Sequence, residues 1–155
     1  MGTSPWRAAC ALLVGLACAA PAAAHTDGGR QLAFDWPAQG TVTSPFGRDG
    51  WRWHPGLDIG ILRSLEVTAA APGRVVAVGE PVGFAGYGEI VEVDVGSGFL
   101  TLYAHLAEPL VAVGDAVWTG QRIGIAGCTG VCIGTHLHFE VREDGVAVDP
   151  TPLLP

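Results

Sequence analysis

Two histidines near the C-terminal end of the 155-residue chain, His136 and His138, are separated by a single leucine. On a β-strand, side chains two residues apart project from the same face, so both imidazoles would lie on one side. Imidazole nitrogen is a common zinc ligand, and such a pair could supply part of a metal site. An exposed polar strand face is the alternative, and the spacing alone does not decide between the two.

The segment from His54 to Asp58 offers an imidazole nitrogen and a carboxylate oxygen four residues apart, across a Pro-Gly pair that favours a turn. Both groups are good zinc ligands. The alternative is a solvated histidine beside an aspartate that makes a turn hydrogen bond. His105 is a fourth candidate, because it ends an apolar run in which Tyr103 would share its face on a regular strand. Taken singly, such a histidine is usually structural.

The elements that must position these side chains have a period of two, which is typical of β-strands. Strands are predicted at 73–79, 89–95, 99–105 and 135–141, with short ones around Val117 and Ile123. The glycine-rich turn 96–98 predicts that 89–95 and 99–105 form a hairpin. Acidic and apolar residues alternate along 89–95, which indicates one wet face and one buried face. No stretch of ten residues has a helical stripe, so the sequence predicts a single all-β, antiparallel domain.

Composition excludes several classes of function. The chain has 8 basic and 15 acidic residues, a net charge of −7, and all of its basic residues are arginines. Such an acidic chain is poorly suited to binding nucleic acid, which needs a basic face. The absence of lysine excludes Schiff-base chemistry, a Walker loop and a biotinyl or lipoyl attachment site.

The first 24 residues have the pattern of a secretory signal peptide: Arg7, a short apolar run and a small-residue cleavage site. An uncleaved or lipidated anchor is the alternative. We therefore expect a signal peptide at 1–24, a flexible segment at 25–35 and a folded domain at 36–155. The protein is predicted to be secreted or periplasmic, a monomer, and without stable membrane insertion after cleavage.

Cleavage would leave two cysteines, Cys128 and Cys132, in an oxidising compartment. Three intervening residues allow a disulfide between them, whereas two free thiols or a metal-binding pair are the alternatives. Two tryptophans, Trp51 and Trp53, precede His54. They are expected either to pack beneath that segment or to form the rim of a substrate groove.

In combination these motifs resemble a known family. The His54-x3-Asp58, Leu102–Leu106 and His136–Glu140 segments, with flanking text at 43–47, 113–121 and 127–130, are similar to the signatures of the M23 peptidases, the lysostaphin- and LytM-like peptidoglycan endopeptidases. The resemblance implies a compact antiparallel β-sheet fold of the duplicated-hybrid-motif type, with an active-site groove. It covers nearly the whole of the predicted domain.

The resemblance also implies roles for individual residues. One Zn²⁺ would be held by His54, Asp58 and His138, with His105 and His136 as catalytic histidines that do not bind the metal. Three protein ligands leave a fourth position for water, as in catalytic zinc sites. The expected function is a secreted zinc endopeptidase that hydrolyses peptide cross-links of peptidoglycan, its partners being the stem peptides. The alternative is a non-catalytic peptidoglycan-binding or amidase-activating module. Tyr103, Trp51 and Trp53 are the candidates for contact with substrate in the groove.

Overall fold

A computed structural model describes residues 34–49 and 51–155. The predicted signal peptide at 1–24 lies outside the described residues, as does nearly all of the predicted segment 25–35. Within the described part of the chain, no helix combines the length and hydropathy needed to cross a membrane.

The regular secondary structure of these residues is β-strand, apart from one short 3-10 turn, Thr151–Leu153. The strands are β1 Thr41–Ser44, β2 Gly47–Asp49, β3 Arg52–His54, β4 Leu57–Gly60, β5 Glu66–Thr68, β6 Gly73–Gly79, β7 Glu89–Gly96, β8 Phe99–Pro109, β9 Ala116–Val117, β10 Arg122–Ala126, β11 Leu137–Glu143 and β12 Val146–Val148. The predicted all-β class is confirmed, and the predicted strand at 73–79 coincides with β6.

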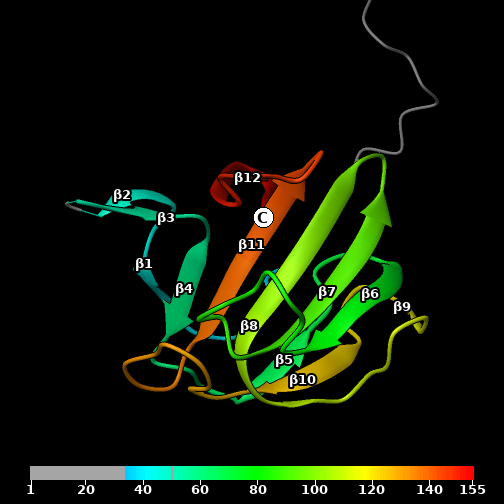
Figure 1. The fold of residues 1–155 in the computed structure, drawn as a ribbon, viewed down its shortest axis with the longest axis horizontal. Helices are drawn as coiled ribbons and strands as arrows, with labels where there is room; N and C mark the ends of the chain where they lie inside the picture. The colour runs from blue at the N-terminus through cyan, green and yellow to red at the C-terminus, as the bar shows by residue number, and fades with distance from the viewer. Residues whose placement is uncertain (1–33, 50) are drawn as a thin grey trace, which may run out of the picture. The chain divides into compact units, whose positions relative to one another are not determined.

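One large antiparallel sheet runs in the order β1-β4-β11-β8-β7-β6-β9. β10 pairs with β5 and β8, β12 pairs with β11, and β2 and β3 form a separate hairpin. Figure 1 shows β11, β8, β7 and β6 side by side, with the β2–β3 hairpin at one end of the sheet beside β4. The predicted hairpin is confirmed as the β7–β8 pair. In this order, β11 lies between β4 and β8, so three sequence-distant motifs become neighbours.

Both faces of the central strands are buried. The main core lies on one face and takes the alternate residues of each strand, for example Val91 and Val93 of β7 and Phe139 of β11. The other face carries Ile90 of β7 in a smaller cluster, covered by Phe84 and Tyr87. The prediction that one face of 89–95 is wet holds only at Asp94, which is exposed; the preceding loop covers the rest of that face, and even Glu92 is buried.

β8 departs from regular strand geometry at His105. Between the pairs Val91–Tyr103 and Glu89–Leu106, β8 has one residue more than β7. This is a β-bulge, and His105 has a φ of 60°, in the left-handed region that non-glycine residues seldom adopt. Alternation of side chains is interrupted at this point, which changes the face on which His105 lies.

Candidate metal centre

The site begins with a cross-strand pair. Asp58 of β4 lies directly opposite His138 of β11, and their flanking residues Leu57, Ile59 and Phe139 enter the core. Because side chains alternate between faces, Asp58 and His138 must both project from the opposite face. Asp58 Oδ1 is 2.8 Å from His138 Nδ1. Two strands that are distant in sequence therefore supply a carboxylate and an imidazole at one point.

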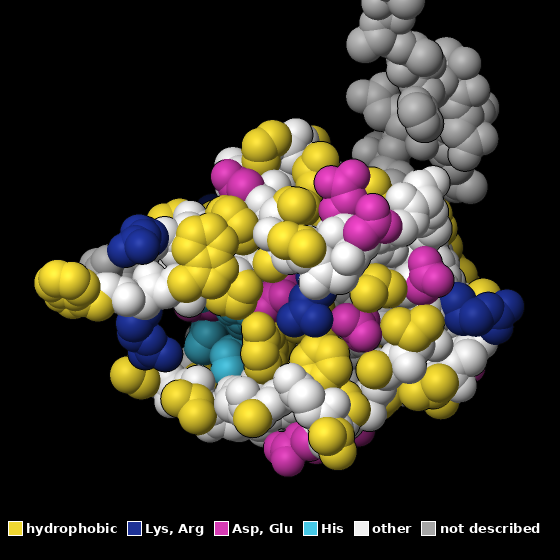
Figure 2. All heavy atoms as spheres, turned by 45° about the horizontal axis from the view of Figure 1, so that its top comes forward, with side chains coloured by type: hydrophobic (Ala, Val, Ile, Leu, Met, Phe, Trp, Pro, Cys, Tyr) yellow, Lys and Arg dark blue, Asp and Glu magenta, His cyan; other side chains and the backbone are white. Residues whose placement is uncertain are grey.

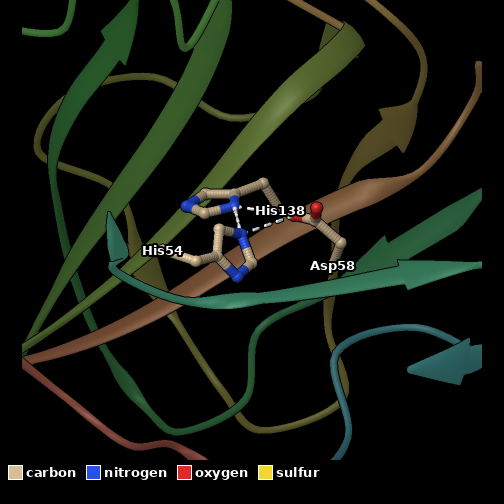
Figure 3. Close-up of side chains that lie close together, drawn as sticks. All are labelled: His54, Asp58 and His138. Atoms are coloured by element: carbon tan, nitrogen blue, oxygen red, sulfur yellow. Dashed lines mark hydrogen bonds and ion pairs between the residues drawn. The ribbon is translucent and has the colours of Figure 1, made fainter. Parts of the chain in front are cut away.

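His54 completes this group from the end of β3. Its Nε2 atom lies 3.1 Å from Asp58 Oδ1 and 3.1 Å from His138 Nδ1. Its other ring nitrogen, Nδ1, donates a 2.8 Å hydrogen bond to the carbonyl of Pro45. Figure 3 shows the three side chains pointing toward one another, with the two imidazoles meeting at the carboxylate.

The outer hydrogen bonds fix the tautomers of the two imidazoles. His54 Nδ1 carries a proton because it donates to a carbonyl, and His138 Nε2 carries one because it donates to Glu140 Oε1 at 3.0 Å. The facing nitrogens, His54 Nε2 and His138 Nδ1, then have lone pairs when the rings are neutral. Asp58 adds a third acceptor to the same point. Three converging acceptors need a proton or a cation between them, and two imidazoles with one carboxylate are a donor set that suits zinc.

The electrostatics of the group favour positive charge. The hydrogen bond with Asp58 raises the pKa of His54. Burial alone would lower the pKa of His138, but Asp58 and Glu140 outweigh it and raise that pKa. Burial would likewise raise the pKa of Asp58, yet its contacts with His138 and His54 hold that pKa well below its usual range. The charge that favours an extra proton here would equally stabilise a bound metal ion.

The other two histidines lie beside this group. The ring centroids of His105 and His136 are 4.8 Å apart, and His136 Nε2 is 3.6 Å from Asp58 Oδ1. His105 Nδ1 donates to the carbonyl of Thr129 at 2.8 Å, and His136 Nδ1 donates to that of Gly134 at 2.9 Å. Both histidines therefore keep Nε2 free to accept a proton. Burial also lowers the pKa of His105, which favours its neutral form.

A cleft of about 730 Å³ contains all five of these residues. Figure 2 shows histidine side chains within a hollow, beside arginines. Arg52 and Trp53 of β3 line the cleft, and Trp53 packs edge-on against Phe46. Trp51 is 99% exposed, so it does not pack beneath this segment as one alternative expected. It is not among the residues that line the cleft, and its contact with substrate stays a prediction.

Tyr103 does not lie where the sequence led us to expect it. It was expected to share the face of His105 and to contact substrate, but it is fully buried in the main core. Its hydroxyl accepts a hydrogen bond from the Ala70 amide and donates one to Thr101 Oγ1. Burial raises its pKa to about 12, so the phenol stays protonated. The bulge at His105 is the reason: the extra residue turns His105 toward the cleft, while Tyr103 keeps to the core face.

The two cysteines lie close to His136, with Cys132 Sγ 3.7 Å from His136 Nδ1. Cys128 and Cys132 are joined by a disulfide, with Cα atoms 5.3 Å apart, in the segment between β10 and β11. Cys132 itself lines the cleft.

The polar cluster that contacts His138 Nε2 was not identified from the sequence. Glu140, which is fully buried, accepts hydrogen bonds from His138, from the hydroxyl of Tyr87 at 2.6 Å and from Arg142 Nε at 2.7 Å. Arg142 also lies over the ring of Phe84. Burial would raise the pKa of Glu140, but these donors hold it below its usual value. The period of two could have identified it, since Glu140 follows His138 by two residues and must share its face.

Residues 52–150 match the model of peptidase family M23. The murein hydrolase activator EnvC of Escherichia coli is 37% identical over 122 residues, which are 77% of this chain and 28% of that protein. The chain spans less than half the length of such curated relatives.

Two solved structures share the fold. A zinc-containing peptidase from Vibrio cholerae aligns with a TM-score of 0.65 and 31% identity, covering 76% of this chain and 39% of that one. The catalytic domain of lysostaphin, an antimicrobial peptidase from Staphylococcus simulans, aligns with a TM-score of 0.64 and 29% identity, covering 72% of this chain and 90% of that one. The family model matches more than half of the chain, and the matched range includes Asp58 and the four histidines of the cleft. The chain therefore belongs to peptidase family M23.

Proposed function

We propose that this protein is a zinc-dependent endopeptidase that hydrolyses peptide cross-links of peptidoglycan. In this proposal His54, Asp58 and His138 hold the metal. The observation that carries it is the convergence of three acceptor atoms, all within about 3 Å of one another, beside two histidines that bind no part of the group. Complete ligand sets with free neighbouring bases suit a catalytic site better than a storage site.

When bound, zinc would act as a Lewis acid that activates water and polarises a peptide carbonyl. Residues of the chain itself can move the proton of the attacking water. His136 and His105 present unprotonated Nε2 atoms to the cleft, so one can take the proton of the attacking water and pass it to the amine as the C–N bond breaks. The other can stabilise the developing oxyanion as a hydrogen-bond donor when its Nε2 atom holds a proton taken from solvent. Their distance from the metal group, with His136 Nε2 3.6 Å from Asp58, suits both roles.

The choice of substrate rests on the relatives. Lysostaphin is named an antimicrobial peptidase and EnvC a murein hydrolase activator, which points to the cell wall. We infer the same substrate class here, and with it an envelope or extracellular location reached through the segment 1–24. Both D-Ala–diaminopimelate cross-links and Gly–Gly bridges are candidate bonds.

A second candidate function is that of an activating module for other wall enzymes, which the name of EnvC favours. The complete set of His54, Asp58 and His138 favours the enzyme, because an activator needs no metal and no free imidazoles.

The test is digestion of purified muropeptides by the zinc-loaded protein, with mass analysis of the products. We expect cleavage within a cross-link, and the product masses will identify the bond. Asp58→Ala should abolish it. Zinc-loaded, folded protein that cleaves no muropeptide, yet accelerates a wall amidase, would replace this proposal with the activator function.

A further inference from the structure

Both free histidines of the cleft are held by one segment of the chain. The carbonyl that accepts from His105 belongs to Thr129, and the carbonyl that accepts from His136 belongs to Gly134. Both carbonyls lie between the end of β10 and the start of β11: Thr129 is within the loop that the Cys128–Cys132 disulfide closes, and Gly134 follows Cys132 by two residues. This segment, 128–134, is here called the disulfide loop. It selects the nitrogen that each histidine presents to the cleft.

The first half of the disulfide loop has further anchors. Thr129 Oγ1 donates to the carbonyl of Leu106 at 2.8 Å and accepts from the amide of Glu89 at 2.9 Å. The amide of Val131 donates to the carbonyl of Gly86 at 2.8 Å. The Thr129 carbonyl that holds His105 is thus fixed by contacts that do not involve the disulfide.

Close packing of two glycines adds to this anchoring. Gly130 and Gly88 both have positive φ, 71° and 63°, and a Cβ atom on Gly130 would lie 2.4 Å from the Gly88 amide nitrogen. Only glycine fits at such an approach. The neighbouring Tyr87 carbonyl accepts from the His105 amide at 2.9 Å, so the same contact supports the strained backbone of His105.

The second half of the disulfide loop has fewer anchors. Ile133 is fully exposed, so hydrophobic burial does not hold this part in place. Among the described residues, the disulfide is the contact that ties 132–135 to the rest of the domain, whereas His136 is held by its bridge to Gly127 and lies against His105 and Asp58. The Gly134 carbonyl therefore depends on the disulfide in a way that the Thr129 carbonyl does not.

We propose that the Cys128–Cys132 disulfide is a positioning element for His136: by holding the Gly134 carbonyl, it keeps His136 Nε2 directed at the metal group. His105, held through Thr129, is independent of it. None of the residues His54, Asp58 and His138 belongs to the disulfide loop, so we expect metal binding not to depend on the disulfide. This inference rests on the proposed peptidase function for its kinetic consequence, but its structural claim does not.

The test compares the zinc-loaded full chain with its Cys128→Ser/Cys132→Ser variant. We expect unchanged zinc content and KM but a kcat lower by about 10- to 100-fold, the cost of misplacing a catalytic group by about an ångström. ¹⁵N spectra of the imidazoles should show the Nδ1-protonated form of His136 giving way to a mixture, while His105 keeps its tautomer. A phosphine reductant should lower kcat of the unmodified protein in the same way, reversibly on reoxidation, and should not affect the serine variant.

Three outcomes would overturn the proposal. A serine variant with unaltered kcat and unaltered His136 tautomer would show that the disulfide positions nothing. Loss of zinc or of the folded state would assign the disulfide a general structural role. Equal disturbance of His105 and His136 would contradict the division of the loop into two halves. If the unmodified protein cleaves no muropeptide, the proposed function fails, whereas the imidazole spectra still decide the positioning role.

Discussion

Replacement of Glu140 by glutamine should weaken zinc binding without removing any ligand. The carboxylate uses both oxygens as acceptors: Oε1 for His138 Nε2 and the Tyr87 hydroxyl, and Oε2 for Arg142 Nε. A glutamine side chain has one acceptor oxygen and one donor amide. Whichever way it is oriented, its amide faces a donor, so either His138 or Arg142 loses its partner.

The expected size of this effect follows from the burial of the site. Glu140 is fully buried and the His138 side chain is 7% exposed, so water cannot replace the lost acceptor. Loss of an outer hydrogen-bond partner of a metal-bound histidine typically lowers metal affinity by about 10- to 100-fold, or about 1.4–2.7 kcal/mol. The carboxylate of Glu140 also favours positive charge at the site, so removing its negative charge should weaken zinc binding further.

The assay is competition for zinc with a chromogenic chelator at fixed pH, with thermal unfolding measured on the same samples. Glu92→Gln is the matched control. It removes the same charge from the same network, but Glu92 lies 3.8 Å from Arg142 and makes no contact with His138. Its zinc affinity should stay within about twofold of the unmodified protein. Tyr87→Phe, which removes one hydrogen bond to Oε1, should give a smaller loss than Glu140→Gln.

A folded Glu140→Gln variant that binds zinc as tightly as the unmodified protein would refute this reasoning. So would an equal loss in the Glu92→Gln control, because the effect would then be one of overall charge and not of the contact with His138.

Three further predictions concern the cleft. Asp58→Ala should lose most of its bound zinc by elemental analysis, whereas a mere turn residue would leave the metal content unchanged. His136→Ala should retain zinc and lower kcat by at least about 10²-fold, while His138→Ala should lose both metal and activity; a reversed pattern of metal content would exchange their roles. His105→Asn should fold as stably as the unmodified protein but with reduced turnover, because asparagine tolerates a positive φ. His105→Val should in addition unfold at lower temperature, and equal melting temperatures for the two variants would contradict the strain at this position.

Much of this architecture could be predicted from local pattern. The period of two identified β6, the β7–β8 hairpin and the shared face of His136 and His138, because side-chain direction in a strand depends only on residue parity. The Cys128–Cys132 pairing could be expected for a similar reason, since so short a loop leaves little conformational freedom.

The parts that could not be predicted depend on contacts between distant segments. Parity placed Tyr103 beside His105, but the bulge in β8 separates them, and a bulge is set by pairing with β7. Residue parity also predicted that the face of β7 opposite the main core is exposed to water, whereas the loop with Phe84 and Tyr87 covers Ile90 on that face. Neither the bulge nor the covering loop has a local signature in the sequence.

By itself, the sequence determined which groups were available: two imidazoles on one strand face, an imidazole and a carboxylate around a turn, and a cysteine pair nearby. Only the tertiary structure decided that Asp58 and His138 are opposite one another, because strand order is fixed by burial of whole faces in a common core. It also decided the tautomers, since the partners that hold the outer nitrogens of His54 and His105 lie in other segments of the chain. A donor set is a property of composition and spacing, whereas its convergence on one point requires the packed sheet.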